Sequence, residues 1–252
     1  MSGHSKWSSI KHQKGITDAR RGQLFTKLTR EITIAARQGG PDPEMNFRLR
    51  LAIQKAKASN MPQDNTERAI KRGAGGEGGQ DALKEVVFEG YGPGGIAILL
   101  QAMTDNHNRT VAEIRNTLTR GGGNLGENGC VAWNFESKGV ITLEVSDDRE
   151  EELTLITIDA GAEDIELYGS MLEIRTPPES FEAVRRVLEE AGAEVENAEL
   201  SLRPKSTLLL DAKRALQTLR LLDKLEELDD VQRVYTNADF PDEALEEYRL
   251  AL

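Results

Sequence analysis

The sequence predicts an α/β (α+β) protein of three domains: a basic helical domain, an α+β middle domain, and a ferredoxin-like domain inserted into the middle one. Three observations carry this prediction. Apolar residues follow helical spacing up to about residue 72 and strand-like spacing afterwards. A glycine-rich stretch at residues 73–79 separates the two patterns. Residues 138–203 follow the order strand, helix, strand, strand, helix, strand, which is that of a ferredoxin-like unit.

The first domain, residues 1–75, is predicted to contain a polar arm and three helices. Apolar side chains recur at helical spacing from residue 18 to residue 38, where two glycines and a proline follow. Asp42 and Pro43 offer an N-cap and a first-turn proline for a second helix that ends near residue 58. A third helix is predicted over residues 63–72, ended by Gly73.

The middle domain is predicted to combine residues 80–136 with residues 205–240, because only a few elements remain after the ferredoxin-like unit at residues 137–204. Thr110 and Glu113 form a capping-box pattern that would begin a helix. The other expected elements are strands at 86–91, 96–103, 130–135 and 231–236 and a long helix at about 210–228.

Charge is distributed very unevenly along the chain. The net charge is −11, yet residues 1–75 hold 15 Lys and Arg against 6 Asp and Glu, which gives +9 there and −20 in the remainder. A polyanion would be attracted to the first segment and repelled by most of the rest. This asymmetry predicts that the N-terminal end faces nucleic acid.

Composition also predicts the compartment. The single cysteine, Cys130, excludes an internal disulfide framework, as expected for a reducing cytoplasm. No apolar run approaches the roughly 20 residues that span a bilayer, and the first residues lack a secretory signal. We therefore expect a soluble, cytoplasmic protein without membrane contact.

No pattern for a cofactor, a metal ion or catalysis is found, and we expect a protein that is not an enzyme. Two glycine loops, at residues 90–95 and 121–126, match a dinucleotide fingerprint in letters, but neither lies between a strand and a following helix, so tight turns are the better interpretation. The polar segment 104–110 is interpreted as a helix cap rather than a ligand site. His107 has no partner at zinc-ligand spacing, and Cys130 is expected to enter a core from a strand.

Basic residues of the first domain are the candidate site. Around Trp7, the cations of the arm suit phosphates together with a stacked base, and the cations of the helices lie mostly off the apolar stripes. The predicted nucleic-acid contacts are Lys6, Trp7, Lys11, Lys14, Arg20, Arg21, Lys27, Arg30, Lys55, Lys57, Arg68, Lys71 and Arg72.

Several runs of the sequence together resemble the YebC/PmpR family. They are Met1-Ser2-Gly3-His4-Ser5-Lys6-Trp7, Asn60-Met61-Pro62, Glu67-Arg68-Ala69-Ile70, Glu89-Gly90-Tyr91-Gly92-Pro93-Gly94-Gly95, Thr104-Asp105-Asn106 and Gly122-Gly123-Asn124-Leu125-Gly126. The resemblance implies a three-domain α/β protein that is cytoplasmic in bacteria. It also implies a role as a DNA-binding transcriptional regulator, while mitochondrial relatives are described as translational activators. It implies no catalytic residues.

Two function classes therefore remain open at the level of sequence. One is a transcriptional regulator that binds DNA, and the other is a ribosome-associated translation factor that binds ribosomal RNA. Both require a basic face, and the acidic domains could contact protein partners in either case. The strongly acidic remainder slightly favours a large ribonucleoprotein as the target.

Overall fold

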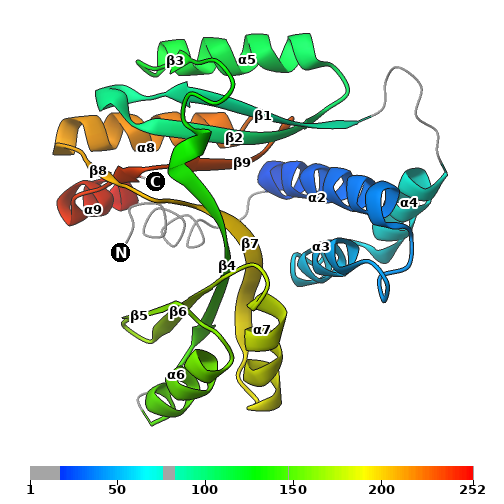
Figure 1. The fold of residues 1–252 in the computed structure, drawn as a ribbon. Coiled ribbons are helices and arrows are strands. Elements are labelled where there is room, and N and C mark those ends of the chain that lie inside the picture. Colours follow the sequence, from blue (N-terminus) through cyan, green and yellow to red (C-terminus); the bar gives the residue numbers. More distant parts are fainter. Residues whose placement is uncertain (1–17, 76–82, 147, 252) are drawn as a thin grey trace. The chain divides into compact units, whose positions relative to one another are not determined.

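The computed structural model describes residues 18–75, 83–146 and 148–251. It has the predicted mixed α/β architecture of three domains (Figure 1), so the fold class is confirmed. Residues 133–206 form one compact unit, and the described residues before and after that segment form the other. The helical and middle domains therefore belong to the same unit.

The helical domain consists of α2 (Asp18–Gly39), α3 (Phe47–Ala58) and α4 (Gln63–Ala74). Its core is apolar and includes the buried side chains of Leu28, Ile32 and Leu49. The second helix begins four residues later than the sequence predicts. Asn46, not Asp42, is its cap: the Asn46 side chain accepts a hydrogen bond from the backbone N–H of Leu49 at 3.1 Å and donates one to the carbonyl of Ala35 at 2.8 Å.

The middle domain is built on a four-stranded antiparallel sheet in the order β3-β1-β2-β9. The strands are β1 (Lys84–Tyr91), β2 (Ala97–Thr104), β3 (Asn124–Leu125) and β9 (Val231–Thr236). The helices are α5 (His107–Arg120), α8 (Ala212–Glu226) and α9 (Asp242–Leu250). A short parallel pair, β8 (Leu208–Leu209) and β10 (Ala238–Asp239), completes the domain. Leu100 of the sheet, Ile114 of α5 and Leu222 of α8 are fully buried in one core.

Two predictions for this domain were wrong, one about where a helix begins and one about a strand. The helix α5 begins at His107, because Asn106 caps it by accepting from the N–H of Arg109 at 3.1 Å, and Thr110 is buried inside the helix. The expected strand at 130–135 is a turn followed by a short 3-10 helix, Ala132–Asn134, and only Phe135 is extended. Its backbone N–H groups donate to a side-chain carboxylate, described below, instead of to a neighbouring strand.

The unit at residues 133–206 is a ferredoxin-like domain. Its strands are β4 (Phe135–Glu144), β5 (Asp164–Tyr168), β6 (Met171–Thr176) and β7 (Val195–Pro204), and its helices are α6 (Glu150–Asp159) and α7 (Phe181–Glu190). The sheet order β5-β6-β4-β7, with every neighbouring pair antiparallel, is that of the predicted topology. The strands β4 and β7 pair along nearly their whole length, beginning with Phe135 opposite Pro204.

The two glycine loops are tight turns, as predicted. Gly94 and Gly95 have φ angles of 78° and 81°, and Gly122 has a φ of 83°, a region that favours glycine. The first loop contains the short 3-10 helix Pro93–Gly95 between β1 and β2, and the second lies between α5 and β3. Neither loop precedes a helix, so neither has the strand–loop–helix context of a dinucleotide site.

Candidate nucleic-acid interface

The arm contacts predicted from sequence lie outside the described residues. These are Lys6, Trp7, Lys11 and Lys14, and they stay predictions. Arg20 lies on α2, but its side chain is also outside the described part of the molecule. The structure therefore bears on the helical contacts that follow it.

Three of the predicted cations are exposed at the ends of α3 and α4. They are Lys57 in the last turn of α3 and Lys71 and Arg72 in the last turn of α4. Within residues 18–75, 83–146 and 148–251, no side-chain hydrogen bond or ion pair engages any of the three. Cations in a last turn also offset the partial negative charge of a helix C-terminus, but this leaves their ammonium and guanidinium groups open to an external phosphate.

Three further predicted cations have partners inside the protein. The Arg68 side chain donates to the Asp64 carbonyl at 3.1 Å and to the Asn65 side chain, both on α4. Arg21 is exposed on α2 and Lys55 is half-buried on α3, and both interact with neighbouring groups. The contacts of Arg68 lie within one helix, so its exposed guanidinium can exchange them for a phosphate at small cost.

Two predicted contacts, Lys27 and Arg30, join α2 to the last residue of α8 and to the segment between α8 and β9. The Lys27 ammonium donates to the carbonyl of Glu226 at 2.5 Å. The Arg30 guanidinium donates to the carbonyl of Asp229 and lies 3.0 Å from a carboxylate oxygen of Asp230. A phosphate at either cation would have to compete with these contacts. Sequence reasoning missed this role, because the partners lie at the opposite end of the chain.

Asp230 is a buried carboxylate that joins three elements of the middle and helical domains. Its side chain is only 3% exposed. One of its oxygens accepts from Arg109 at 2.8 Å, from Thr110 at 2.7 Å and from Thr104 at 3.1 Å. Burial by itself would raise the pKa of Asp230, but the hydrogen bonds from Arg109, Thr110 and Thr104 and the charge of Arg30 hold that pKa below its ordinary value.

The polar segment 104–110 caps a helix, as the sequence indicated, and it also binds the Asp230 carboxylate. Asn106 caps α5, and the Thr104 hydroxyl accepts from the backbone N–H of Asn106 at 2.9 Å. In addition, Thr104, Arg109 and Thr110 surround Asp230. The sequence gives no signal for this carboxylate, since nothing in its local pattern distinguishes Asp230 from Asp229.

A second buried carboxylate, Glu89 on β1, holds the loop that follows β3. It accepts from the backbone N–H groups of Gly129 at 2.6 Å, Val131 at 2.7 Å and Ala132 at 2.7 Å. Burial would raise the pKa of Glu89, but these three backbone hydrogen bonds lower it overall. Cys130 lies in the same loop and is half-buried, rather than entering a core from a strand as predicted. Burial raises the pKa of its thiol, so the reactive thiolate is disfavoured.

No metal site is formed by the described residues: within 18–75, 83–146 and 148–251, no three or more His, Cys, Asp or Glu side chains are grouped to hold a metal ion. His107 is the first residue of α5, where its ring faces Phe88 with 5.6 Å between ring centroids. None of the helices in this described part is both long enough and apolar enough to cross a membrane.

Family models cover nearly the whole chain. Residues 5–76 match the TACO1/YebC protein N-terminal domain, and residues 83–238 match the TACO1/YebC second and third domain. Curated relatives named "probable transcriptional regulatory protein" include one of Dehalococcoides mccartyi, 55% identical over 248 residues with 98% of each chain covered. Another, of Desulforapulum autotrophicum, is 51% identical over 243 residues, with 96% of this chain and 98% of the relative covered.

A solved structure has the same fold. The crystal structure of a conserved hypothetical protein from Aquifex aeolicus superimposes with a TM-score of 0.83 at 49% sequence identity, covering 92% of this chain and 96% of that chain. A match over 92% of this chain extends into all three domains, in agreement with both family models. The chain belongs to the TACO1/YebC family.

Proposed function

We propose that this protein regulates gene expression by binding nucleic acid through its basic helical domain, in the cytoplasm and without catalysing a reaction. One observation carries the proposal: residues 1–75 have a net charge of +9 in a chain whose remainder has −20. Lys57, Lys71 and Arg72 display part of that charge at exposed positions. A basic, exposed surface of this kind is the electrostatic footprint of a nucleic-acid-binding domain.

DNA is the proposed target, with transcription as the process. The relatives named "probable transcriptional regulatory protein" support this choice. A second candidate is a translation factor that binds ribosomal RNA, and the distribution of charge favours it. The −20 portion would be repelled by a bare duplex lying along the whole molecule, whereas a large ribonucleoprotein can offer RNA to one domain and basic protein surface to the others.

The dependence of binding on salt tests the role of the helical domain. The variant Lys57→Gln/Lys71→Gln/Arg72→Gln is compared with a matched control, Arg115→Gln/Arg186→Gln/Lys205→Gln, which removes three exposed cations outside that domain. The logarithmic slope of affinity for a labelled oligonucleotide against salt is expected to fall by about 2 in the first variant, since each phosphate contact contributes roughly 0.7–0.9. An equal fall in both variants would overturn the assignment to this domain.

Sedimentation separates the two targets. A cell lysate is run through a sucrose gradient at low and moderate salt, and the protein is located in the fractions. Co-migration with ribosomal particles that is lost in Arg20→Glu/Arg21→Glu would establish the translational candidate. A position at the top of the gradient, together with saturable binding to particular duplex fragments over competitor, would establish the transcriptional one.

A further inference from the structure

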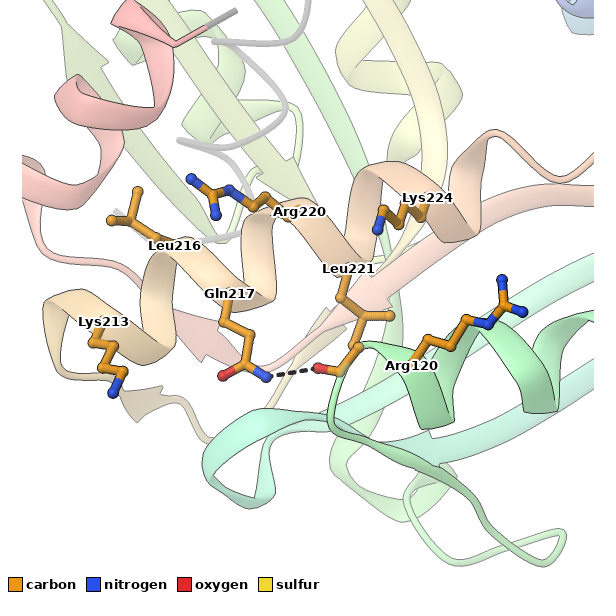
Figure 2. A pocket seen from close by; sticks show the side chains of 8 residues that line it. Arg120, Lys213, Leu216, Gln217, Arg220, Leu221 and Lys224 are labelled. Atoms are coloured by element: carbon orange, nitrogen blue, oxygen red, sulfur yellow. Dashed lines mark hydrogen bonds between the residues drawn. The ribbon is translucent and has the colours of Figure 1, made fainter.

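A basic hollow lies on the middle domain, in the acidic portion of the chain. It is a pocket of about 350 Å³ between the end of α5 and one face of α8 (Figure 2). This volume is at the lower end of the range that small-molecule and cofactor sites occupy. The lining residues are Arg120, Gly121, Lys213, Leu216, Gln217, Arg220, Leu221 and Lys224.

The floor of this hollow is fixed by the docking of α5 on α8. The side-chain amide of Gln217 donates to the carbonyl of Gly121 at 3.0 Å. Gly121 approaches α8 so closely that an added Cβ would lie 2.5 Å from Cδ1 of Leu221. Gln217 thereby satisfies a carbonyl at the C-terminal end of α5 that the helix itself leaves without a donor. The hollow is therefore formed in the folded chain and needs no rearrangement to exist.

Four cations and no acids line the hollow. Arg120 comes from α5, and Lys213, Arg220 and Lys224 recur along one face of α8. No hydrogen bond or ion pair of these four side chains is found in the described part of the chain. Arg214 on the same helix, by contrast, lies 3.5 Å from the Asp211 carboxylate.

Such an arrangement brings like charges close together in the unliganded protein. Arg220 and Lys224 are four residues apart on one helix, where like charges repel each other. A solvated face normally mixes both signs, and the portion of the chain outside residues 1–75 carries −20. An acid-free cluster of cations in such a portion favours an anion as its ligand.

The charged groups are spread around the hollow and do not meet at one point (Figure 2). Because these groups do not converge, a run of phosphates fits them better than a single phosphate does. Leu216, which is partly exposed, and the exposed side chain of Gln217 lie between the cations and offer contacts to the sugar or base parts of such a ligand.

We propose that the α5–α8 hollow, lined by Arg120, Lys213, Arg220 and Lys224, binds a run of phosphates, as in the backbone of a nucleic-acid strand. The inference deepens the proposed function, since it adds a second phosphate site that lies outside the helical domain. It also gives the acidic middle domain a place where nucleic acid can approach without net repulsion. A free polyphosphate or nucleoside triphosphate offers the same chemistry and is the other source.

The test uses the full chain with Arg220→Gln/Lys224→Gln and a matched control, Arg115→Gln/Arg214→Gln, which removes one cation from α5 and one from α8 outside the hollow. Labelled single-stranded and duplex oligonucleotides are titrated at several salt concentrations, and sodium tripolyphosphate is titrated by calorimetry. The hollow variant is expected to lower the salt slope by about 1.5, at roughly 0.7–0.9 for each lost phosphate contact, and to weaken tripolyphosphate binding. The control is expected to leave both as in the wild type.

The oligonucleotide and tripolyphosphate titrations distinguish a nucleic-acid backbone from a free phosphate ligand. They also keep the test of the hollow independent of the proposed function. Loss in the oligonucleotide arm assigns the hollow to a nucleic-acid backbone, and loss in the tripolyphosphate arm alone assigns it to a free phosphate ligand. If the wild-type chain bound no oligonucleotide, the proposed function would fall while the tripolyphosphate arm still decided on the hollow. Wild-type behaviour of the hollow variant in both arms, with an unchanged melting temperature, would overturn the inference.

Discussion

Arg30 of α2 and Asp230, just before β9, form an ion pair with 3.0 Å between guanidinium nitrogen and carboxylate oxygen. The carboxylate is buried and the guanidinium is partly exposed, so the pair lies at the edge of the middle domain. A further link joins Arg48 of α3 to Glu85 of β1 at 2.8 Å. Through these pairs, cations of the helical domain hold it against the middle domain.

Replacing Asp230 is expected to destabilise this unit strongly. Asp230→Ala leaves Arg30, Arg109 and two hydroxyl groups without their common acceptor, and we expect the free energy of unfolding to fall by about 3 kcal/mol. Urea denaturation followed by circular dichroism measures the change. The matched control is Asp229→Ala, because Asp229 is exposed and contributes its backbone carbonyl to Arg30. Equal stability of the two variants would contradict the role of Asp230.

Acid is expected to destabilise the protein through the same carboxylate and through Glu89. Both have a pKa lowered in the folded state. Their contribution to stability is therefore fully present above the unfolded-state pKa, about 4, and is lost as pH falls through the lower folded-state pKa. Urea midpoints measured from pH 6 down to pH 2 should fall steeply in the wild type and less steeply in Asp230→Asn. The idea fails if both proteins have the same dependence on pH.

Glu89→Gln is expected to loosen the loop at residues 126–132. A carboxylate accepts three backbone N–H groups there, whereas an amide offers a single acceptor oxygen and places its NH₂ against donors. A loss of about 2 kcal/mol in unfolding free energy is expected, with faster hydrogen exchange of the Val131 and Ala132 amides. Glu127→Gln, an exposed change in the same loop, should leave exchange at the wild-type rate.

A pair of glycine substitutions tests the packing of the helical domain. Gly73 of α4 is buried, and an added Cβ would collide with the Thr33 carbonyl and lie 2.8 Å from Cβ of Ala36 on α2. Gly73→Ala should therefore lower the free energy of unfolding by about 1–3 kcal/mol. Gly22→Ala, on the exposed face of α2 with open space around it, should raise it by up to about 1 kcal/mol. Thermal unfolding followed by circular dichroism gives the sign of the stability change in each variant.

Charge reversal of Arg20 and Arg21 tests the first turn of α2. The variant Arg20→Glu/Arg21→Glu is expected to bind oligonucleotides more weakly and with a flatter dependence on salt, because two proposed phosphate contacts are lost and two repulsive charges are added. Anisotropy titrations across a range of salt concentrations measure the slope. A slope equal to that of the wild type would remove these residues from the interface.

Much of the fold could be predicted from sequence, because periodicity and turn residues are local signals. The ferredoxin-like order, the helices of the first domain and the glycine turns all follow from such patterns. The errors have non-local causes: Glu89 takes the backbone N–H groups that an expected strand at 130–135 would have used. The predicted start of α5 was wrong because Thr104, Asp105 and Asn106 are all suited to cap a helix. Asn106 is the cap, since its side chain accepts from the backbone N–H of Arg109.

The candidate site was less accessible to sequence reasoning. Charge along the chain identifies a basic domain, but it does not reveal which cations are engaged inside the protein. Lys27 and Arg30 look like Lys57 and Lys71 in sequence, and they differ only because the segment 226–230 folds back against α2. The hollow at α8 was missed for a similar reason, since Arg120 lies far along the chain from Lys213 and Lys224.

The close approach of the two ends of the ferredoxin-like domain bears on how the middle sheet folds. Asn134 and Ser206 are joined by side-chain and backbone hydrogen bonds, with the Ser206 N–H donating to the Asn134 side chain at 3.1 Å. Once this domain has folded, the chain between β2 and β9 behaves as though the inserted residues were a short connection. Closing the loop between β2 and β9 then becomes cheaper by about 0.8 kcal/mol, since excluding residues 133–206 shortens that loop a little more than twofold. Prior folding of the inserted domain should therefore bring its two flanking segments together, and β9 should then join the sheet faster.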